Sequence, residues 1–275
     1  MSAAVQRFMQ LHQQSQPFIL VNVWDAASLI LAQQQGAVAV ATSSAALAWS
    51  LGYADGSALP ATELIAAAHR LLRVSKVPLS IDLEQGYSDD PRQVAQLVKQ
   101  LTEAGIAGIN LEDGHDKPEQ LAEKIMACRQ LLAGTPLFIN ARTDVYLSQL
   151  CSADAAVDEC ISRLTRYQQA GADGAFIPGL TDLAAVTQLH RQLALPINLM
   201  GWPADATHSA LNEAGVKRIS SGPALFLQCY NYYQQACHSF LQIEQPEEQA
   251  LTYTGLNQLF SQTNTLPGQP AVNAQ

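Results

Sequence analysis

The chain has 275 residues, 48% of them hydrophobic and 14% charged, which is enough to bury a large core. Acidic residues outnumber Lys and Arg by 24 to 15, giving a net charge of −9, and no basic run occurs, which argues against a nucleic-acid or anionic-membrane surface. No stretch approaches the roughly 18 apolar residues of a membrane span, and the first residues lack the apolar segment of a secretion signal. The five cysteines show no CxxC spacing and suit free thiols in a reducing compartment. We therefore expect a cytoplasmic protein that acts on small molecules, without nucleic-acid or membrane partners.

Short apolar, β-rich runs alternate with longer amphipathic stretches from residue 18 onward, a rhythm typical of βα units around a parallel sheet. The predicted strands are 18–24, 37–43, 77–84, 108–113, 136–144, 174–179, 196–202 and 216–222. Glycines follow several intervening segments, at positions 36, 105, 171 and 215, where they are expected to end helices. Eight units without a linker favour a closed (β/α)8 TIM barrel over a doubly wound sheet, which usually stops at five or six strands.

We expect one domain over residues 1–275, with the barrel at about 18–240 and a C-terminal extension at 241–275. The extension is polar and rich in Gln and Asn, with a helical patch near 247–262. Its last ten residues, LPGQPAVNAQ, have a composition that suggests disorder or docking onto another chain.

Polar side chains gather at the ends of three successive predicted strands, the place where such barrels carry their catalytic groups. They alternate along each strand and so point inward: Asp82 and Glu84, then Asn110 and Glu112, then Asn140, Arg142 and Asp144. Three carboxylates, those of Asp82, Glu84 and Glu112, would repel one another at the barrel mouth without a cation. Oxygen ligands without histidine or cysteine favour Mg²⁺, or Mn²⁺, over zinc.

Other residues near these strand ends have both a functional and an ordinary structural interpretation. Arg142 could clamp a substrate carboxylate or phosphoryl group, or could make a structural ion pair. Ser43 and Ser44 could offer hydroxyl and amide groups to an anion, or could form an ordinary turn. The Ser-Ser-Gly-Pro turn at 220–223 lies where barrels often bind phosphate. Asp25, Asp113 and Asp144 are expected to cap helices rather than to act in the site.

Five runs together resemble the phosphoenolpyruvate mutase/isocitrate lyase superfamily. They are NVWDAAS at 22–28, SSAALAWSLGYADG at 43–56, SIDLEQGY at 80–87, GINLEDG at 108–114 and NARTD at 140–144. The resemblance spans residues 18–200 and implies a β/α barrel, usually tetrameric, with the last helix exchanged between subunits. It also implies that Mg²⁺ holds a 2-oxo acid or its enolate.

The resemblance assigns roles to individual positions of this chain. Asp82 matches the direct metal ligand, and Asp55, Glu84 and Glu112 match acids that bind the metal's waters. Ser43 and Ser44 match residues whose backbone amides hold the substrate carboxylate, and Arg142 matches a substrate-binding arginine. Asn198 matches a polar group at the end of the seventh strand. Asp55, Glu112 and Arg142 are therefore the expected catalytic residues, and Ser43, Ser44, Asn198 and Arg142 the expected substrate-binding residues.

The chain departs from the superfamily in the loop after the fourth strand, which is shortened. The lyases carry a cysteine general acid there and the phosphonomutases a lysine and an asparagine, whereas this chain has GHDKPEQLAEKI. Cys128 lies inside the following helix and Lys117 is matched by no motif, so the general acid is left without a candidate. The expected function is a Mg-dependent carbon–carbon lyase or decarboxylase that forms a metal-stabilised enolate. Phosphonomutase or P–C hydrolase chemistry, and a non-catalytic binding barrel, are the alternatives, and a homo-oligomer is expected.

Overall fold

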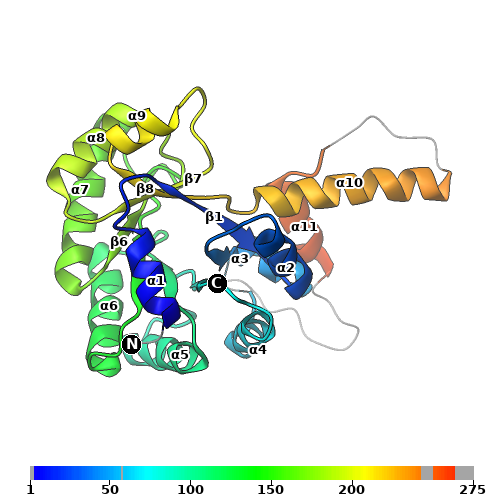
Figure 1. Ribbon diagram of the computed structural model, residues 1–275, viewed down its shortest axis with the longest axis horizontal. Helices are drawn as coiled ribbons and strands as arrows, with labels where there is room; N and C mark the ends of the chain where they lie inside the picture. The colour runs from blue at the N-terminus through cyan, green and yellow to red at the C-terminus, as the bar shows by residue number, and fades with distance from the viewer. Residues whose placement is uncertain (1–2, 57, 243–249, 264–275) are drawn as a thin grey trace.

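The computed structural model describes residues 3–56, 58–242 and 250–263, and these form a closed barrel of eight parallel strands in the order β1 to β8 (Figure 1). Each predicted strand contains an observed one, so the predicted (β/α)8 barrel is confirmed. The strands are β1 Phe18–Val23, β2 Val40–Thr42, β3 Leu79–Asp82, β4 Gly108–Glu112, β5 Phe138–Arg142, β6 Gly174–Phe176, β7 Ile197–Met200 and β8 Val216–Ser220. The barrel closes where β1 pairs with β8, with Leu20 opposite Ser220.

Most of the helices follow a strand and cover the outside of the barrel, whereas α1 precedes β1 and α10 points away from the barrel (Figure 1). They are α1 Ala3–Leu11, α2 Ala26–Gln34, α3 Ser44–Ser50, α4 Ala61–Leu72, α5 Pro91–Ala104, α6 Pro118–Leu132, α7 Ala153–Ala170, α8 Leu183–Gln192, α9 His208–Glu213, α10 Ala224–Leu241 and α11 Tyr253–Thr263. Asp25 caps α2 through a reciprocal capping box with Ser28, which confirms its predicted role. Gly105 and Gly171 end α5 and α7 in the left-handed conformation, as the sequence predicts.

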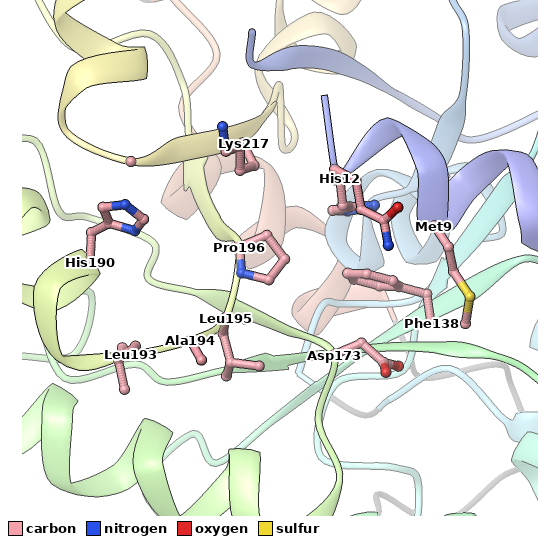
Figure 2. Close-up of a pocket in the computed structure, with 12 residues that line it drawn as sticks. Met9, His12, Phe138, Asp173, His190, Leu193, Ala194, Leu195, Pro196 and Lys217 are labelled. Atoms are coloured by element: carbon pink, nitrogen blue, oxygen red, sulfur yellow. The ribbon is translucent and has the colours of Figure 1, made fainter. Parts of the chain in front are cut away.

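The N-terminal end of the barrel is closed by α1. Phe8 is fully buried there, and its ring makes edge contacts with Phe18 and Phe138 at centroid distances of 6.3 and 5.5 Å. A side chain at Gly108 would bring its Cβ to 2.7 Å from the Phe8 ring, so this strand position has room only for glycine. A cavity of about 440 Å³ lies beside this aromatic cluster. Figure 2 shows Met9, His12 and Phe138 on one side of it and Pro196 and Leu195 on the other.

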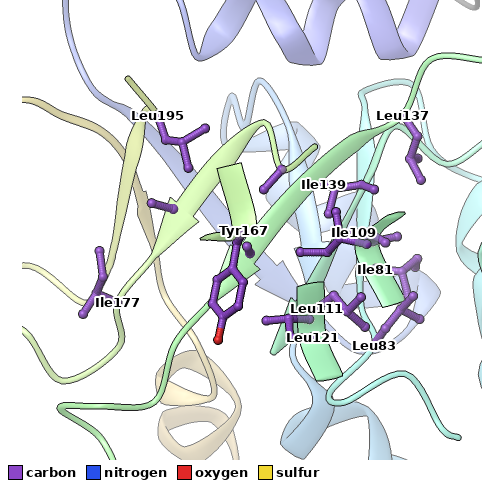
Figure 3. Close-up of a cluster of buried hydrophobic side chains, with 14 of the residues drawn as sticks. Ile81, Leu83, Ile109, Leu111, Leu121, Leu137, Ile139, Tyr167, Ile177 and Leu195 are labelled. Atoms are coloured by element: carbon purple, nitrogen blue, oxygen red, sulfur yellow. The ribbon is translucent and has the colours of Figure 1, made fainter. Parts of the chain in front are cut away.

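The main core lies between the strands and the surrounding helices. Ile81, Ile109 and Ile139 come from the outer faces of three adjacent strands, and all three are fully buried. Figure 3 shows these side chains in a layer together with Leu121 of α6. The strands alternate apolar residues toward this layer with polar residues toward the barrel axis, and this alternation brings the polar groups together inside.

The C-terminal elements behave differently from the barrel helices. Helix α10 projects away from the barrel (Figure 1), and Phe226, close to its start, is its only buried residue. Helix α11 instead lies back against α3. The predicted helical patch is therefore observed in part, while residues 247–249 and the 266–275 tail lie outside the described residues. Within the described chain, none of the helices has the length and apolar character needed to cross a membrane.

Candidate active site

A cavity of about 450 Å³ opens at the C-terminal end of the barrel, where the sequence places its polar residues. Five of the predicted site residues line it: Ser43, Ser44, Asp55, Asp82 and Arg142. Phe176, Met200 and Leu147 give the cavity an apolar wall. Such a combination of convergent polar groups and apolar lining is typical of a small-molecule site.

Asp82 ends β3 at the base of this cavity and is 7% exposed. Its Oδ2 accepts a hydrogen bond from the Ser44 backbone N–H at 3.4 Å, and its own backbone N–H donates to Thr42 Oγ1 at 2.9 Å. Its Oδ1 is buried and has no hydrogen-bond partner among the described residues. Burial raises the pKa of Asp82, Arg142 opposes the rise, and the nearby charge of Asp55 adds to it. The carboxylate therefore lacks a positive partner on one side.

Asp55 approaches the cavity from the loop after α3. Its Oδ1 is also buried without a partner among the described residues, while its Oδ2 accepts a hydrogen bond from Tyr253 Oη at 2.5 Å. Two carboxylates that interact electrostatically, each with an unpartnered oxygen, suit a bound cation. No three His, Cys, Asp or Glu side chains of the described chain are grouped closely enough to hold a metal ion alone. A hard ion that keeps several waters, as Mg²⁺ does, fits this donor set.

Glu84 and Glu112 are buried at the same strand ends but do not line the cavity. Glu84 has a positive φ of 48°, unusual for a residue with a side chain, and its Oε1 accepts a hydrogen bond from Tyr87 Oη at 3.3 Å. Burial raises the pKa of Glu112 well above its usual value, although Arg142 Nη1 lies 2.7 Å from its Oε2 and opposes the rise. Glu112 is joined to the cavity through Arg142, which lines it.

Arg142 lies between two carboxylates. Its Nε and Nη2 donate to the two oxygens of Asp144 at 2.6 and 2.9 Å, and its Nη1 pairs with Glu112. Burial works against the charged guanidinium, but Glu112 and Asp144 outweigh it and raise the pKa of Arg142. A guanidinium has five N–H donors, so two remain for a ligand in the cavity. The ion-pair interpretation is confirmed, and the predicted substrate contact remains compatible with it.

Asn198 and the Ser-Ser-Gly-Pro turn contribute less to the cavity than their sequence positions suggest. Asn198 is buried on β7, opposite Arg218 of β8. It does not line the cavity, whereas Met200 on the same strand does. Ser220, Gly222 and Pro223 line the cavity, but the Gly222 N–H donates to Asn22 Oδ1 at 2.9 Å. The turn therefore offers an anion fewer donors than its sequence suggests.

The capping prediction was wrong for Asp113 and Asp144. The helices that follow them have Lys117 and Ser152 at their N-caps. Asp144 pairs with Arg142, and Asp113 is fully buried behind the site, where it accepts hydrogen bonds from Thr143, Asp144, Arg163 and Tyr167. Asp113 therefore braces the end of β5, the strand that carries Arg142.

Sequence reasoning missed three contributors to the cavity and its surroundings. Asn22 lines the cavity, and its Nδ2 donates to Thr42 O at 2.8 Å. It belongs to the NVWDAAS motif at 22–28, but the motif assigned no role to this residue. Tyr253 comes from α11, about 200 residues from its partner Asp55, and no local pattern indicates the contact. Arg218 is a fully buried guanidinium beneath the site, and its Nη2 donates to Asn110 Oδ1 at 3.1 Å.

The loop after the fourth strand is short in the structure, since β4 ends at Glu112 and α6 begins at Pro118. Cys128 is fully buried within α6, and burial raises the pKa of its thiol to about 12. Lys117 is the N-cap of the same helix and does not line the cavity. Neither residue can donate a proton in the cavity from these positions.

Comparison with known proteins agrees with this geometry. A model of the phosphoenolpyruvate phosphomutase family matches residues 8–241. An uncharacterized Mycobacterium tuberculosis protein is 36% identical over 219 residues, which cover 78% of this chain and 81% of that protein. Oxaloacetate decarboxylase 2 of Pseudomonas fluorescens is 30% identical over 221 residues, covering 75% of this chain and 73% of that enzyme.

Among solved structures, one from Burkholderia cenocepacia J2315, provisionally named a phosphonomutase, is similar to this chain. The TM-score is 0.80 at 34% identity, and the match covers 86% of this chain and 99% of that one. These comparisons confirm the resemblance given by the five motifs and the prediction that the protein is an enzyme. The chain belongs to the phosphoenolpyruvate phosphomutase family.

Proposed function

We propose that the protein is a Mg²⁺-dependent lyase that decarboxylates or cleaves a carbon–carbon bond of a small 2-oxo acid, with oxaloacetate as the first substrate to test. The observation that carries the proposal is the pair of buried, unpartnered oxygens, Asp82 Oδ1 and Asp55 Oδ1, in a cavity that Arg142 also lines. The similarity to an oxaloacetate decarboxylase supports this choice of substrate.

The acids at the strand ends would bind the cation, and Arg142 and the serines would bind the substrate. Asp82 would hold the cation directly, while Asp55, Glu84 and Glu112 would hold its water molecules. When bound, Mg²⁺ supplies positive charge that draws electrons toward the keto oxygen as the bond breaks. The two free donors of Arg142 and the backbone amide of Ser43 would bind the substrate carboxylate and fix its orientation. The Ser44 amide, which donates to Asp82 Oδ2 at 3.4 Å, would be shared between Asp82 and the substrate. Asn198 contributes to the polar environment below the cavity rather than through direct contact.

The reaction requires little else from the chain. In oxaloacetate decarboxylation the C3–C4 bond breaks, its electron pair moves toward C2 and the keto oxygen, and carbon dioxide leaves. One proton from water then returns to C3 to give pyruvate. Decarboxylation therefore suits a chain whose short loop carries no general acid, since the one proton that the reaction needs, at C3, comes from water.

The experiment is a substrate panel with the full-length protein. Oxaloacetate, 2-methylisocitrate, isocitrate and phosphonopyruvate are each incubated with Mg²⁺ or with EDTA, and pyruvate, glyoxylate and phosphate are measured. Because Mg²⁺ alone promotes oxaloacetate decarboxylation, each rate is compared with a protein-free Mg²⁺ control. We expect metal-dependent pyruvate release from oxaloacetate. Phosphate release from phosphonopyruvate would favour P–C chemistry, and loss of none of the substrates would favour a binding protein.

We also propose that the enzyme is a cytoplasmic homo-oligomer, a dimer or tetramer. The sequence comparison implied exchange of the last helix, but α11 lies against α3 of its own chain, so we propose that α10 is the helix exchanged between subunits. The projection of α10 and its exposed aromatic side chains support this: Tyr232 is 74% exposed and Phe240 is 88% exposed. Light scattering gives the oligomer size, and a monomer at micromolar concentration would contradict the exchange.

A further inference from the structure

Helix α11 joins the C-terminal extension to the mouth of the barrel. Leu256 of α11 is buried in a small apolar cluster with Trp49 of α3 and Phe226 of α10. The Leu251 backbone N–H, just before the helix, donates to Asn231 Oδ1 of α10 at 2.6 Å. The extension is thus anchored on both elements next to the cavity.

Two polar side chains of α11 converge on a single residue of the site, Asp55. Asn257 Oδ1 accepts hydrogen bonds from the Asp55 backbone N–H at 2.6 Å and from Trp49 Nε1 at 3.0 Å. Tyr253 Oη donates to Asp55 Oδ2 at 2.5 Å, and Tyr253 also lines the cavity. One residue of α11 therefore holds the backbone of Asp55, and the other holds its carboxylate.

This arrangement divides the two carboxylate oxygens of Asp55 between different tasks. Oδ2 is held by the phenol, so the carboxylate cannot rotate freely, and Oδ1 is left buried without a protein partner among the described residues. A carboxylate that binds a cation or its waters works best when a second group fixes its orientation in this way.

We propose that Tyr253 and Asn257 are positioning residues of the active site, which hold Asp55 so that its Oδ1 faces the cation position. The C-terminal helix is then a working part of the site and not only a covering for the barrel. The inference rests on the proposed function in one respect, since it takes Asp55 as a residue that serves the cation.

The alternative explanation is that α11 has a purely structural role. The two explanations can be tested separately because the ring and the hydroxyl of Tyr253 make different contacts. The ring packs against Trp49 at a centroid distance of 5.4 Å, whereas the hydroxyl contacts the carboxylate. Tyr253→Phe keeps the ring and removes only the hydroxyl. Tyr232→Phe removes the same group from a position on α10 that does not line the cavity, and it is the matched control.

The experiment measures Mg²⁺ affinity by calorimetry without substrate, the activity on oxaloacetate, and the melting temperature. We expect Tyr253→Phe to weaken Mg²⁺ binding and to lower kcat/KM, each by about 10- to 100-fold, the usual effect of losing a group that orients a metal-site residue. Its melting temperature should stay close to that of Tyr232→Phe. Asn257→Ala should weaken Mg²⁺ binding in the same direction, and this second variant serves if the first fails to fold.

The outcomes distinguish this inference from the proposed function. If the wild-type protein turns over no substrate but Tyr253→Phe still weakens Mg²⁺ binding, the proposed lyase activity fails and the positioning role stands. If the wild-type protein is active and Tyr253→Phe matches it in both affinity and rate, the positioning role is overturned. A wild-type protein that binds no Mg²⁺ at millimolar concentration overturns both.

Discussion

The two ends of the barrel carry buried side chains of opposite character. At the N-terminal end, Phe8 of α1 packs its ring against Phe18 and Phe138. At the C-terminal end, Asp82 and Asp55 are buried with one oxygen each lacking a protein partner among the described residues. The first end gains free energy from packing, and the second leaves charges buried without full compensation.

This difference separates stability from function within one barrel. Buried charges cost free energy unless they are paired, so proteins usually retain them where function requires them. Substitutions of the unpartnered carboxylates at the C-terminal end should therefore change activity more than stability, and substitutions in the aromatic cluster at the N-terminal end should do the reverse.

The largest expected effect is that of Asp82→Asn on activity. The amide keeps the size of the side chain but loses the negative charge of the proposed direct ligand, and several kcal/mol of transition-state stabilisation corresponds to about 1,000-fold in kcat/KM. Because burial raises the pKa of Asp82, removing the charge should not lower the melting temperature measured in EDTA. A variant that keeps more than a tenth of the wild-type activity would rule out Asp82 as a metal ligand.

Arg142→Met should affect both properties, because this guanidinium belongs to the site and to an ion-pair cluster. We expect kcat/KM to fall by about 100-fold through loss of the substrate contact. The free energy of unfolding should also fall, by about 3–5 kcal/mol, since Glu112 and Asp144 would be left buried without their partner. Arg92→Met is the control, because Arg92 forms an exposed pair with Asp90 and should change neither quantity measurably.

Phe8→Ala tests the opposite end of the barrel. Removing this fully buried ring should lower the free energy of unfolding by about 3–5 kcal/mol, measured by urea denaturation. The kcat of the folded fraction should be unchanged, and Leu31→Ala, at a position 58% exposed on α2, should be nearly neutral in stability. If Phe8→Ala lowered kcat in proportion to its stability loss, the two ends of the barrel would not be separable.

The sequence alone predicted the eight strands and the burial of Asp82, Glu84, Glu112 and Arg142 at neighbouring strand ends, because these follow from local alternation and from the parallel order of the strands. Of the four, Asp82 and Arg142 line the cavity. The role of Asp113 could not be predicted from local sequence. A carboxylate after a strand is a common helix cap, and its actual partners, among them Arg163 and Tyr167, come from a helix whose packing no local pattern specifies.

The contacts of α11 and of His12 could not be predicted for the same reason. The bond between Tyr253 and Asp55 joins residues 198 positions apart and depends on how α10 and α11 pack. His12 lies in a polar stretch of sequence that gives no sign of burial, yet it is 5% exposed and stacks on Phe138 at 3.8 Å. Both depend on long-range packing, which sets the burial of a side chain.

The smallest expected effect is a pH dependence of stability from His12. Burial, with a further contribution from Arg218, lowers the pKa of His12 from 6.5 to about 3, although the hydrogen bond to Phe8 O opposes the shift. Between these pH values the unfolded chain binds a proton that the folded chain does not, so the free energy of unfolding falls as the pH drops. At about 1.4 kcal/mol per pH unit, the His12 contribution from pH 6.5 to 5 is about 2 kcal/mol.

His12→Phe keeps a ring against Phe138 and removes the titratable group, so its free energy of unfolding should fall less steeply over this pH range than that of the wild type. Urea denaturation at pH 7.5, 6.5, 5.5 and 5 gives both slopes, and His115→Phe, at an exposed position, should keep the wild-type slope. Comparing slopes cancels the carboxylates of the C-terminal end, since these are common to all three proteins. Equal slopes for wild type and His12→Phe would mean that the N-terminal end of the barrel admits a charged imidazole, and the contrast between the two ends would then be one of packing alone.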